Sequence, residues 1–159
     1  MNSGVVVDTG VFGASLSRRG SHLASLYARH LTGQVLVLAA QSVAELRYGA
    51  LLAGWGHGRV DELERRIAAA RVVPPDNELV WAHARLRVAC RNAGHPLAAD
   101  AHAANLWVAV TAVHFGMPLV AHDGVFRGTP GLALVTNSTN GAGSGGKRRW
   151  VGPPILLLA

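Results

Sequence analysis

The sequence predicts an α/β fold in which helices cover both faces of a mostly parallel central sheet. Short apolar runs, several of them β-branched, alternate along the chain with longer segments whose apolar residues recur at helical spacing. Such alternation is typical of parallel strands joined by crossover helices. The chain has 159 residues, of which 50% are hydrophobic and 15% are charged. This length and composition fit one compact domain with a buried core.

The amino-terminal half begins with a strand and continues through alternating patterns. Three consecutive valines end at Asp8, so a buried strand is expected to carry a charged group at its exit. The glycine-rich GWGHG segment is interpreted as a connector between two helices. In chain order we expect a helix, a strand and two helices over residues 16–31, 35–39, 43–52 and 61–70.

The carboxyl-terminal half adds two helices and three short strands. Asp76 is expected to cap a helix over residues 78–91, and Asp100 is expected to cap a helix over residues 101–115. Asp123 directly follows an apolar run, which again places a carboxylate at a strand exit. The short strands are predicted at residues 72–73, 119–121 and 132–135.

The composition changes abruptly after residue 136. We therefore predict a domain over residues 1–136 and a tail over residues 137–159. The tail begins with the linker-like tract NSTNGAGSGG and continues with KRRW and VGPPILLLA. Two interpretations stay open. The tail is an appendage from an expression vector or a shifted reading frame, or it is a basic, apolar peptide that docks onto the domain as a partner would.

The charge balance favours contact with a polyanion. Fifteen Lys and Arg against nine Asp and Glu give a formal net charge of +6. Three of the basic residues lie in the tail, so the bias of the domain itself is mild. Cys90 is the only cysteine, which excludes an intrachain disulfide and favours a reducing compartment. Because we recognise no secretory signal and no membrane span, we expect a cytoplasmic protein without a membrane partner.

Three acidic residues fall where the predicted strands end. Asp8 leaves the first strand, Glu45 lies in the first turn of the helix after the second, and Asp123 leaves a later one. The carboxyl ends of parallel strands share one edge of a sheet, so these side chains are expected to meet. Clustered carboxylates repel one another, and a divalent cation relieves that repulsion. Oxygen ligands without zinc-type His or Cys spacing favour Mg²⁺ or Mn²⁺ and phosphodiester hydrolysis.

Each acid also has a structural interpretation. Asp8 before Thr9-Gly10 is compatible with a turn or a helix N-cap, and Asp123 before a glycine is compatible with a turn. Ser42 and Glu45 match the S-x-x-E capping box, in which the glutamate bonds back to the serine backbone. The DTG triplet also occurs in aspartic proteases, but their nearly all-β fold conflicts with the helical patterns. The joint arrangement, more than any single residue, indicates a metal-dependent site.

Four segments in order resemble the successive blocks of PIN-domain ribonucleases, specifically the VapC toxins of bacterial toxin–antitoxin pairs. They are VVVDTGVF, SVAELRYGA, ANLWVAVTAVHFGMPLVAHDGVF and GLALVT, and the resemblance covers residues 4 to 136. It implies a PIN-like three-layer α/β/α sandwich whose acidic residues bind Mg²⁺ or Mn²⁺ and cleave RNA. By motif position, Asp8, Glu45 and Asp123 would be metal-binding catalytic residues, and Thr9 would be a secondary one. The fourth catalytic acid of the family corresponds to Asn105.

Asn105 distinguishes this chain from the pattern it resembles. An asparagine keeps the size of aspartate and offers a carbonyl oxygen, but it lacks the negative charge. The resemblance therefore implies the toxin component of a toxin–antitoxin pair, an endoribonuclease whose activity is impaired or abolished. The alternative is a catalytically inactive PIN-like module that binds RNA or protein. The implied partners are RNA, a cognate VapB-type antitoxin and a second copy of the chain in a homodimer.

Overall fold

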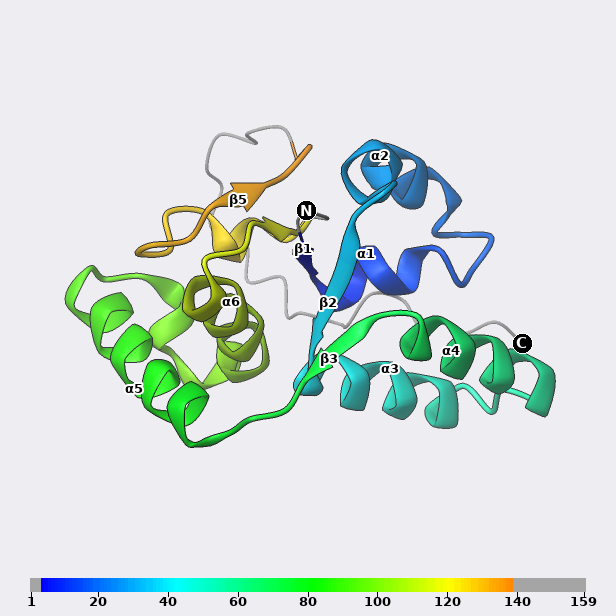
Figure 1. The fold of residues 1–159 in the computed structure, drawn as a ribbon, viewed down its shortest axis with the longest axis horizontal. Coiled ribbons are helices and arrows are strands. Elements are labelled where there is room, and N and C mark those ends of the chain that lie inside the picture. Colours follow the sequence, from blue (N-terminus) through cyan, green and yellow to red (C-terminus); the bar gives the residue numbers. More distant parts are fainter. Residues whose placement is uncertain (1–3, 139–159) are drawn as a thin grey trace.

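Five parallel strands form the central sheet, in the order β3-β2-β1-β4-β5 (Figure 1). The computed structural model describes residues 4–138, and the structural statements below concern these residues. The chain runs outward from the central β1 to β3, and then continues on the other side of β1 with β4. The predicted parallel sheet is thereby confirmed. The strands are β1 (Gly4–Val7), β2 (Val35–Ala39), β3 (Arg71–Val73), β4 (Leu119–Val120) and β5 (Leu134–Val135).

Helices cover both faces of the sheet, as predicted (Figure 1). Within residues 4–138 the α-helices are α1 (Thr9–Ala14), α2 (Ser21–Leu31), α3 (Ala40–Leu52), α4 (His57–Ala68), α5 (Asn77–Asn92) and α6 (Ala103–Phe115). Three short 3-10 helices are η1 (Pro96–Ala98), η2 (Asp100–His102) and η3 (Gly124–Phe126). In Figure 1, α5 and α6 lie on one side of the strands, and α1 to α4 lie on the other.

The pleat of β1 divides the core into two layers. Successive side chains of a strand point to opposite faces, and accordingly Val6 belongs to one hydrophobic cluster and Val5 and Val7 to the other. The first cluster contains Leu106 of α6 and Cys90 of α5, so the cysteine is a buried core residue. These two clusters produce the three-layer α/β/α sandwich. No helix among residues 4–138 is long and apolar enough to cross a membrane.

Several predicted helix starts differ from the structure. The helix expected over residues 16–31 begins only at Ser21, and residues 9–14, for which no helix was predicted, form α1. A Cβ atom on Gly20 would lie 2.2 Å from the backbone oxygen of Ala14, so the chain between the helices turns back too closely for any side chain. The predicted connector GWGHG is shorter than expected, because α4 already begins at His57.

The two predicted aspartate caps have different outcomes. Asp76 caps α5, since its Oδ1 accepts a hydrogen bond from the N–H of Leu79 at 2.8 Å. Asp100 does not cap α6, which begins at Ala103. Asp100 lies in η2, where its carboxylate accepts a hydrogen bond from Arg87. Residues 139–159, which contain the KRRW sequence, lie outside the described residues.

Candidate functional site

The exits of β1 and β4 lie side by side in the middle of the sheet. The N–H of Asp8 donates a hydrogen bond to the carbonyl of Val120 at 3.0 Å, and Asp123 follows three residues later. Between these two strands the order of the sheet reverses, because β2 and β3 lie on one side and β4 and β5 on the other. Open α/β sheets bind ligands at such a reversal, outside the carboxyl ends of the strands. Asp8 and Asp123 therefore occupy the expected ligand position.

Glu45 reaches the same edge from α3, which follows β2. The capping-box interpretation is wrong, because α3 begins at Ala40 and Ser42 lies inside the helix with a buried hydroxyl that has no partner within residues 4–138. Glu45 binds elsewhere: its Oε2 accepts a hydrogen bond from the hydroxyl of Thr9 at 2.8 Å. A residue next to Asp8 thus fixes the carboxylate of Glu45.

The carboxyl group of Asp8 is strongly perturbed. Its side chain is only 8% exposed. Burial and then the negative charges of Asp123 and Glu45 raise the pKa of Asp8 from 3.8 to about 7. The N–H groups of Thr9 and Gly10 lower this pKa in part, although neither makes a side-chain capping bond of normal geometry with Asp8. Two carboxylates from distant parts of the sequence therefore act electrostatically on Asp8.

Glu45 and Asp123 each have a local contact as well. Burial raises the pKa of Glu45, while hydrogen bonds from the side chains of Thr9 and Gln41 lower it in part. Asp123 accepts a hydrogen bond at Oδ1 from the N–H of Val125 at 2.9 Å, at the start of η3. The turn interpretation of Asp123 is thus confirmed. It coexists with the effect of the Asp123 charge on Asp8.

Asn105 is the third residue of α6 and is half-buried. Helix α6 packs against β1 and α3, the elements that precede Asp8 and carry Glu45. Asn105 is not among the groups that shift the pKa of Asp8 or of Glu45. The structure therefore joins three of the four predicted catalytic residues electrostatically, and it places the fourth on a neighbouring helix.

The donors at this edge are carboxylate and hydroxyl oxygens, the ligand type that Mg²⁺ and Mn²⁺ prefer. The repulsion that raises the pKa of Asp8 also fits a bound cation. In residues 4–138, however, no group of three His, Cys, Asp or Glu side chains is arranged to hold a metal ion. The residues thus fit a divalent cation by charge and donor chemistry, and coordination would need their side chains to draw together.

Tyr27 supports this edge and was not singled out from the sequence. Its fully buried hydroxyl lies 3.2 Å from the carbonyl of Ala121, to which it donates, and it accepts from the N–H of Asn137 at 2.9 Å. Nδ1 of His122 and Oγ1 of Thr136 are also within hydrogen-bond distance, at 3.0 and 3.3 Å. One side chain of α2 thereby joins the exits of β4 and β5 immediately before Asp123.

Removing the Tyr27 hydroxyl is expected to destabilise the fold. Tyr27→Phe keeps the ring and leaves buried polar groups of Ala121 and Asn137 without this partner. We expect the free energy of unfolding to fall by about 1–3 kcal/mol, measured by chemical denaturation. The control is Tyr48→Phe, because that side chain is 66% exposed. Equal stability of the two variants would contradict the supporting role of Tyr27.

A three-layer sandwich with carboxylates at the reversal of a parallel sheet defines a PIN-like α/β domain. The family model described as PIN domain matches residues 5–132. The chain therefore belongs to the PIN domain family, as the sequence blocks indicated. A comparison with curated proteins gives no match.

Several solved structures with the same fold are of bacterial proteins. A chain of VapBC2 from Rickettsia felis, bound to a DNA fragment from its promoter, has a TM-score of 0.68 at 14% identity, over 83% of this chain and 97% of that chain. A chain of FitAcB from Neisseria gonorrhoeae has a TM-score of 0.66 at 23% identity, over 82% and 95%. A chain of the toxin–antitoxin complex VapBC-5 from Mycobacterium tuberculosis has a TM-score of 0.59 at 24% identity, over 87% and 100%. At these identities the likeness concerns the fold.

Proposed function

We propose that this PIN domain is the toxin component of a toxin–antitoxin pair, an endoribonuclease that uses Mg²⁺ or Mn²⁺ and is impaired by Asn105. The observation that carries the proposal is the Asp8 carboxyl group, which is buried at the edge where ligands bind and is opposed there by the charges of Asp123 and Glu45. The fold similarity to chains of VapBC and FitAcB supports the toxin assignment. Cytoplasmic RNA would be the substrate.

Asp8, Glu45 and Asp123 would hold the cation. When bound, a divalent cation supplies Lewis-acid chemistry, since it polarises a phosphodiester and lowers the pKa of water. The chain's own contribution is orientation and charge. Thr9 fixes one oxygen of Glu45, and the N–H of Val125 fixes one oxygen of Asp123. Asp8 must be ionised to act as a ligand, and its pKa of about 7 makes that step sensitive to pH near neutrality.

The proposal is tested by incubating the protein with total RNA in Mg²⁺ or Mn²⁺ and sequencing the 5′ ends of the products. Cleavage is expected to be slow and to stop when the cations are chelated. Asp8→Ala is expected to abolish it without unfolding the protein, which circular dichroism would check. Undiminished cleavage by Asp8→Ala would remove Asp8 from the mechanism.

Asn105 supports a second candidate function, a catalytically inactive PIN-like module that binds RNA or protein. The amide removes one negative charge from the position where the resembling family has its fourth acid. The two candidates differ in whether cleavage appears when that charge is restored, which is the first experiment of the Discussion.

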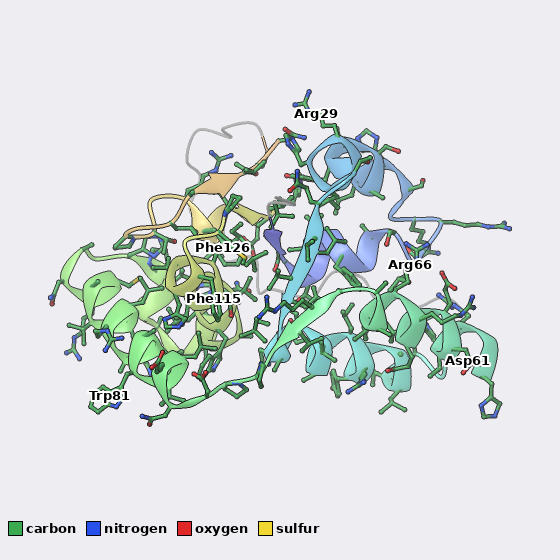
Figure 2. All side chains as sticks on the ribbon, viewed as in Figure 1. Arg29, Asp61, Arg66, Trp81, Phe115 and Phe126 are labelled. Carbon is green, nitrogen blue, oxygen red and sulfur yellow. The ribbon has the colours of Figure 1, made fainter. Side chains whose placement is uncertain are left out.

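We propose a VapB-type antitoxin as the protein partner. A cavity of about 680 Å³ lies between α1, α2 and α4 and is lined mainly by apolar side chains, including Phe12, Ala28 and Leu36. Arg66 of α4, labelled in Figure 2, also lines it. Its guanidinium donates a hydrogen bond to the Ser15 hydroxyl at 3.1 Å. An apolar antitoxin segment would fit this cavity. Among the comparison structures, VapBC-5 is described as a member of a family of toxin–antitoxin systems, which supports such a partner.

A homodimer is the assembly that we propose, and exposed apolar side chains on α3 and α5 support it. On α3, Leu51 and Leu52 are 78% and 73% exposed, and Tyr48 lies one turn earlier. On α5, Trp81 points away from the domain and is 60% exposed (Figure 2). Large exposed apolar side chains that form a patch are typical of association surfaces, and each of these two helices offers candidates for such a patch.

Leu51→Glu is therefore expected to shift the protein from dimer to monomer, because a charge would be buried at the interface. Light scattering after size-exclusion chromatography would measure the molar mass. Ser25→Glu, on the exposed part of α2, adds the same charge outside the α3 and α5 faces and serves as the control. A parent protein that is already monomeric would contradict the proposed dimer.

A further inference from the structure

A second cavity flanks the acidic edge, at the carboxyl ends of β2 and β3. Its volume is about 350 Å³. Ala39 and Val73, the last residues of these strands, form its base, and they are register partners in the sheet. Gln41 and Ala44 of α3 and Trp107 of α6 are among the side chains that line it. The cavity therefore opens at the edge of the sheet where ligands of α/β proteins bind.

Gln41 connects this cavity to the proposed metal site. Its side chain lines the cavity and also donates a hydrogen bond to the carboxylate of Glu45. A glutamine amide has two N–H donors and one carbonyl acceptor, so the bond to Glu45 leaves one donor and the acceptor for another group. A molecule in the cavity would thus lie within reach of a residue that touches the acidic edge.

Trp107 gives the cavity an aromatic wall that is held in place. Its ring is half-buried and packs against the imidazole of His83, with ring centroids 4.1 Å apart and planes inclined by 30°. His83 does not line the cavity, so it supports the indole from outside. The indole is therefore a preorganised surface for stacking.

We propose that this cavity binds one nucleobase of the RNA substrate, stacked on Trp107 and hydrogen-bonded by Gln41. The choice of RNA rests on the proposed function. Sequence-specific RNA recognition splays single bases onto aromatic side chains and reads their edges with amides and other polar groups. A volume of about 350 Å³ lies at the lower end of ligand cavities, which suits one base. The base beside the scissile phosphate would occupy it.

The test measures binding of AMP, GMP, CMP and UMP by ligand-observed NMR in the absence of metal, with ribose 5-phosphate as the probe without a base. At least one nucleotide is expected to bind more tightly than ribose 5-phosphate. Trp107→Leu is expected to weaken that binding by about tenfold, the scale of one lost stacking contact. Trp55→Leu removes a tryptophan outside the cavity and is expected to change it by less than about twofold.

A second variant guards against misfolding of Trp107→Leu. Ala44 is exposed and lines the cavity, so Ala44→Phe fills the space without removing a core contact and is expected to block binding as well. Equal binding of ribose 5-phosphate and all four nucleotides would overturn the proposal, and so would unchanged binding in both cavity variants. Failure of the nuclease assignment gives a different result. The parent would bind nucleotides, Trp107→Leu and Ala44→Phe would lose that binding, and neither the parent nor Asn105→Asp would cleave RNA.

Discussion

Asn105→Asp is expected to increase Mg²⁺-dependent RNA cleavage by at least about 100-fold, the usual scale for one electrostatic group in an active site. Asn105 lies in the first turn of α6, which packs against β1 and α3. A carboxylate there would restore the charge that the resembling family places at this position, and a more negative site would hold a divalent cation more tightly. Initial rates on a fluorescent RNA at fixed Mg²⁺ would measure the gain.

The matched control is Asn92→Asp, which adds the same charge at the exposed end of α5. It is expected to leave the rate unchanged. If Asn105→Asp gives no cleavage above the parent and neither protein binds metal, the nuclease assignment fails and the inactive binding module is favoured. A gain in both variants would instead show a general effect of charge.

The second large effect concerns pH and stability without a divalent cation. The ordinary pKa of an aspartate is 3.8, whereas the pKa of Asp8 in the folded protein is about 7. The folded state therefore binds this proton more tightly than the unfolded state does. The free energy of unfolding should therefore fall as pH rises from about 4 to about 7, by at most about 4 kcal/mol. The raised pKa of Glu45 acts in the same direction. Urea denaturation across this pH range would measure the loss.

The variant Asp8→Asn distinguishes the contribution of the Asp8 carboxyl group to this pH dependence from that of all other titrating groups. The variant cannot ionise at position 8, so it is expected to be more stable than the parent at pH 8 and to show a flatter profile between pH 4 and 7. Addition of Mn²⁺ at pH 8 should stabilise the parent and have little effect on Asp8→Asn. A parent profile as flat as that of the variant would show that the Asp8 carboxylate is not destabilising in the folded state.

The strands were predictable because their signals are local. Consecutive apolar residues at 5–7 and 35–39 lie in β1 and β2, and Asp76 caps its helix as the spacing indicated. Helix α1 was missed because its sequence, TGVFGA, contains two glycines and has low helical propensity. Packing of Val11 and Phe12 into the core stabilises it instead. Local patterns do not record such tertiary contacts.

In the candidate site, too, features set by local sequence were predictable and features set by tertiary contacts were not. Strand exits predicted that Asp8, Glu45 and Asp123 would share an edge, and the charges of Asp123 and Glu45 do raise the pKa of Asp8. The local pattern around Ser42 suggested a cap, but α3 starts two residues earlier, at Ala40. Tyr27 could not be singled out, because its partner carbonyl lies 94 residues away in the sequence. The catalytic roles of the acids and of Asn105 stay predictions until the variants are measured.

The hydrogen bonds of Tyr27 hold the sheet edge without involving any of the proposed catalytic acids. Strands β4 and β5 contain two residues each, so few ladder hydrogen bonds hold the chain that leads to Asp123. A neutral phenol from α2 supplies the missing anchorage, and its contacts do not depend on any carboxylate. We therefore expect this PIN domain to keep its fold when one of the site acids is replaced, whatever the effect of that replacement on activity.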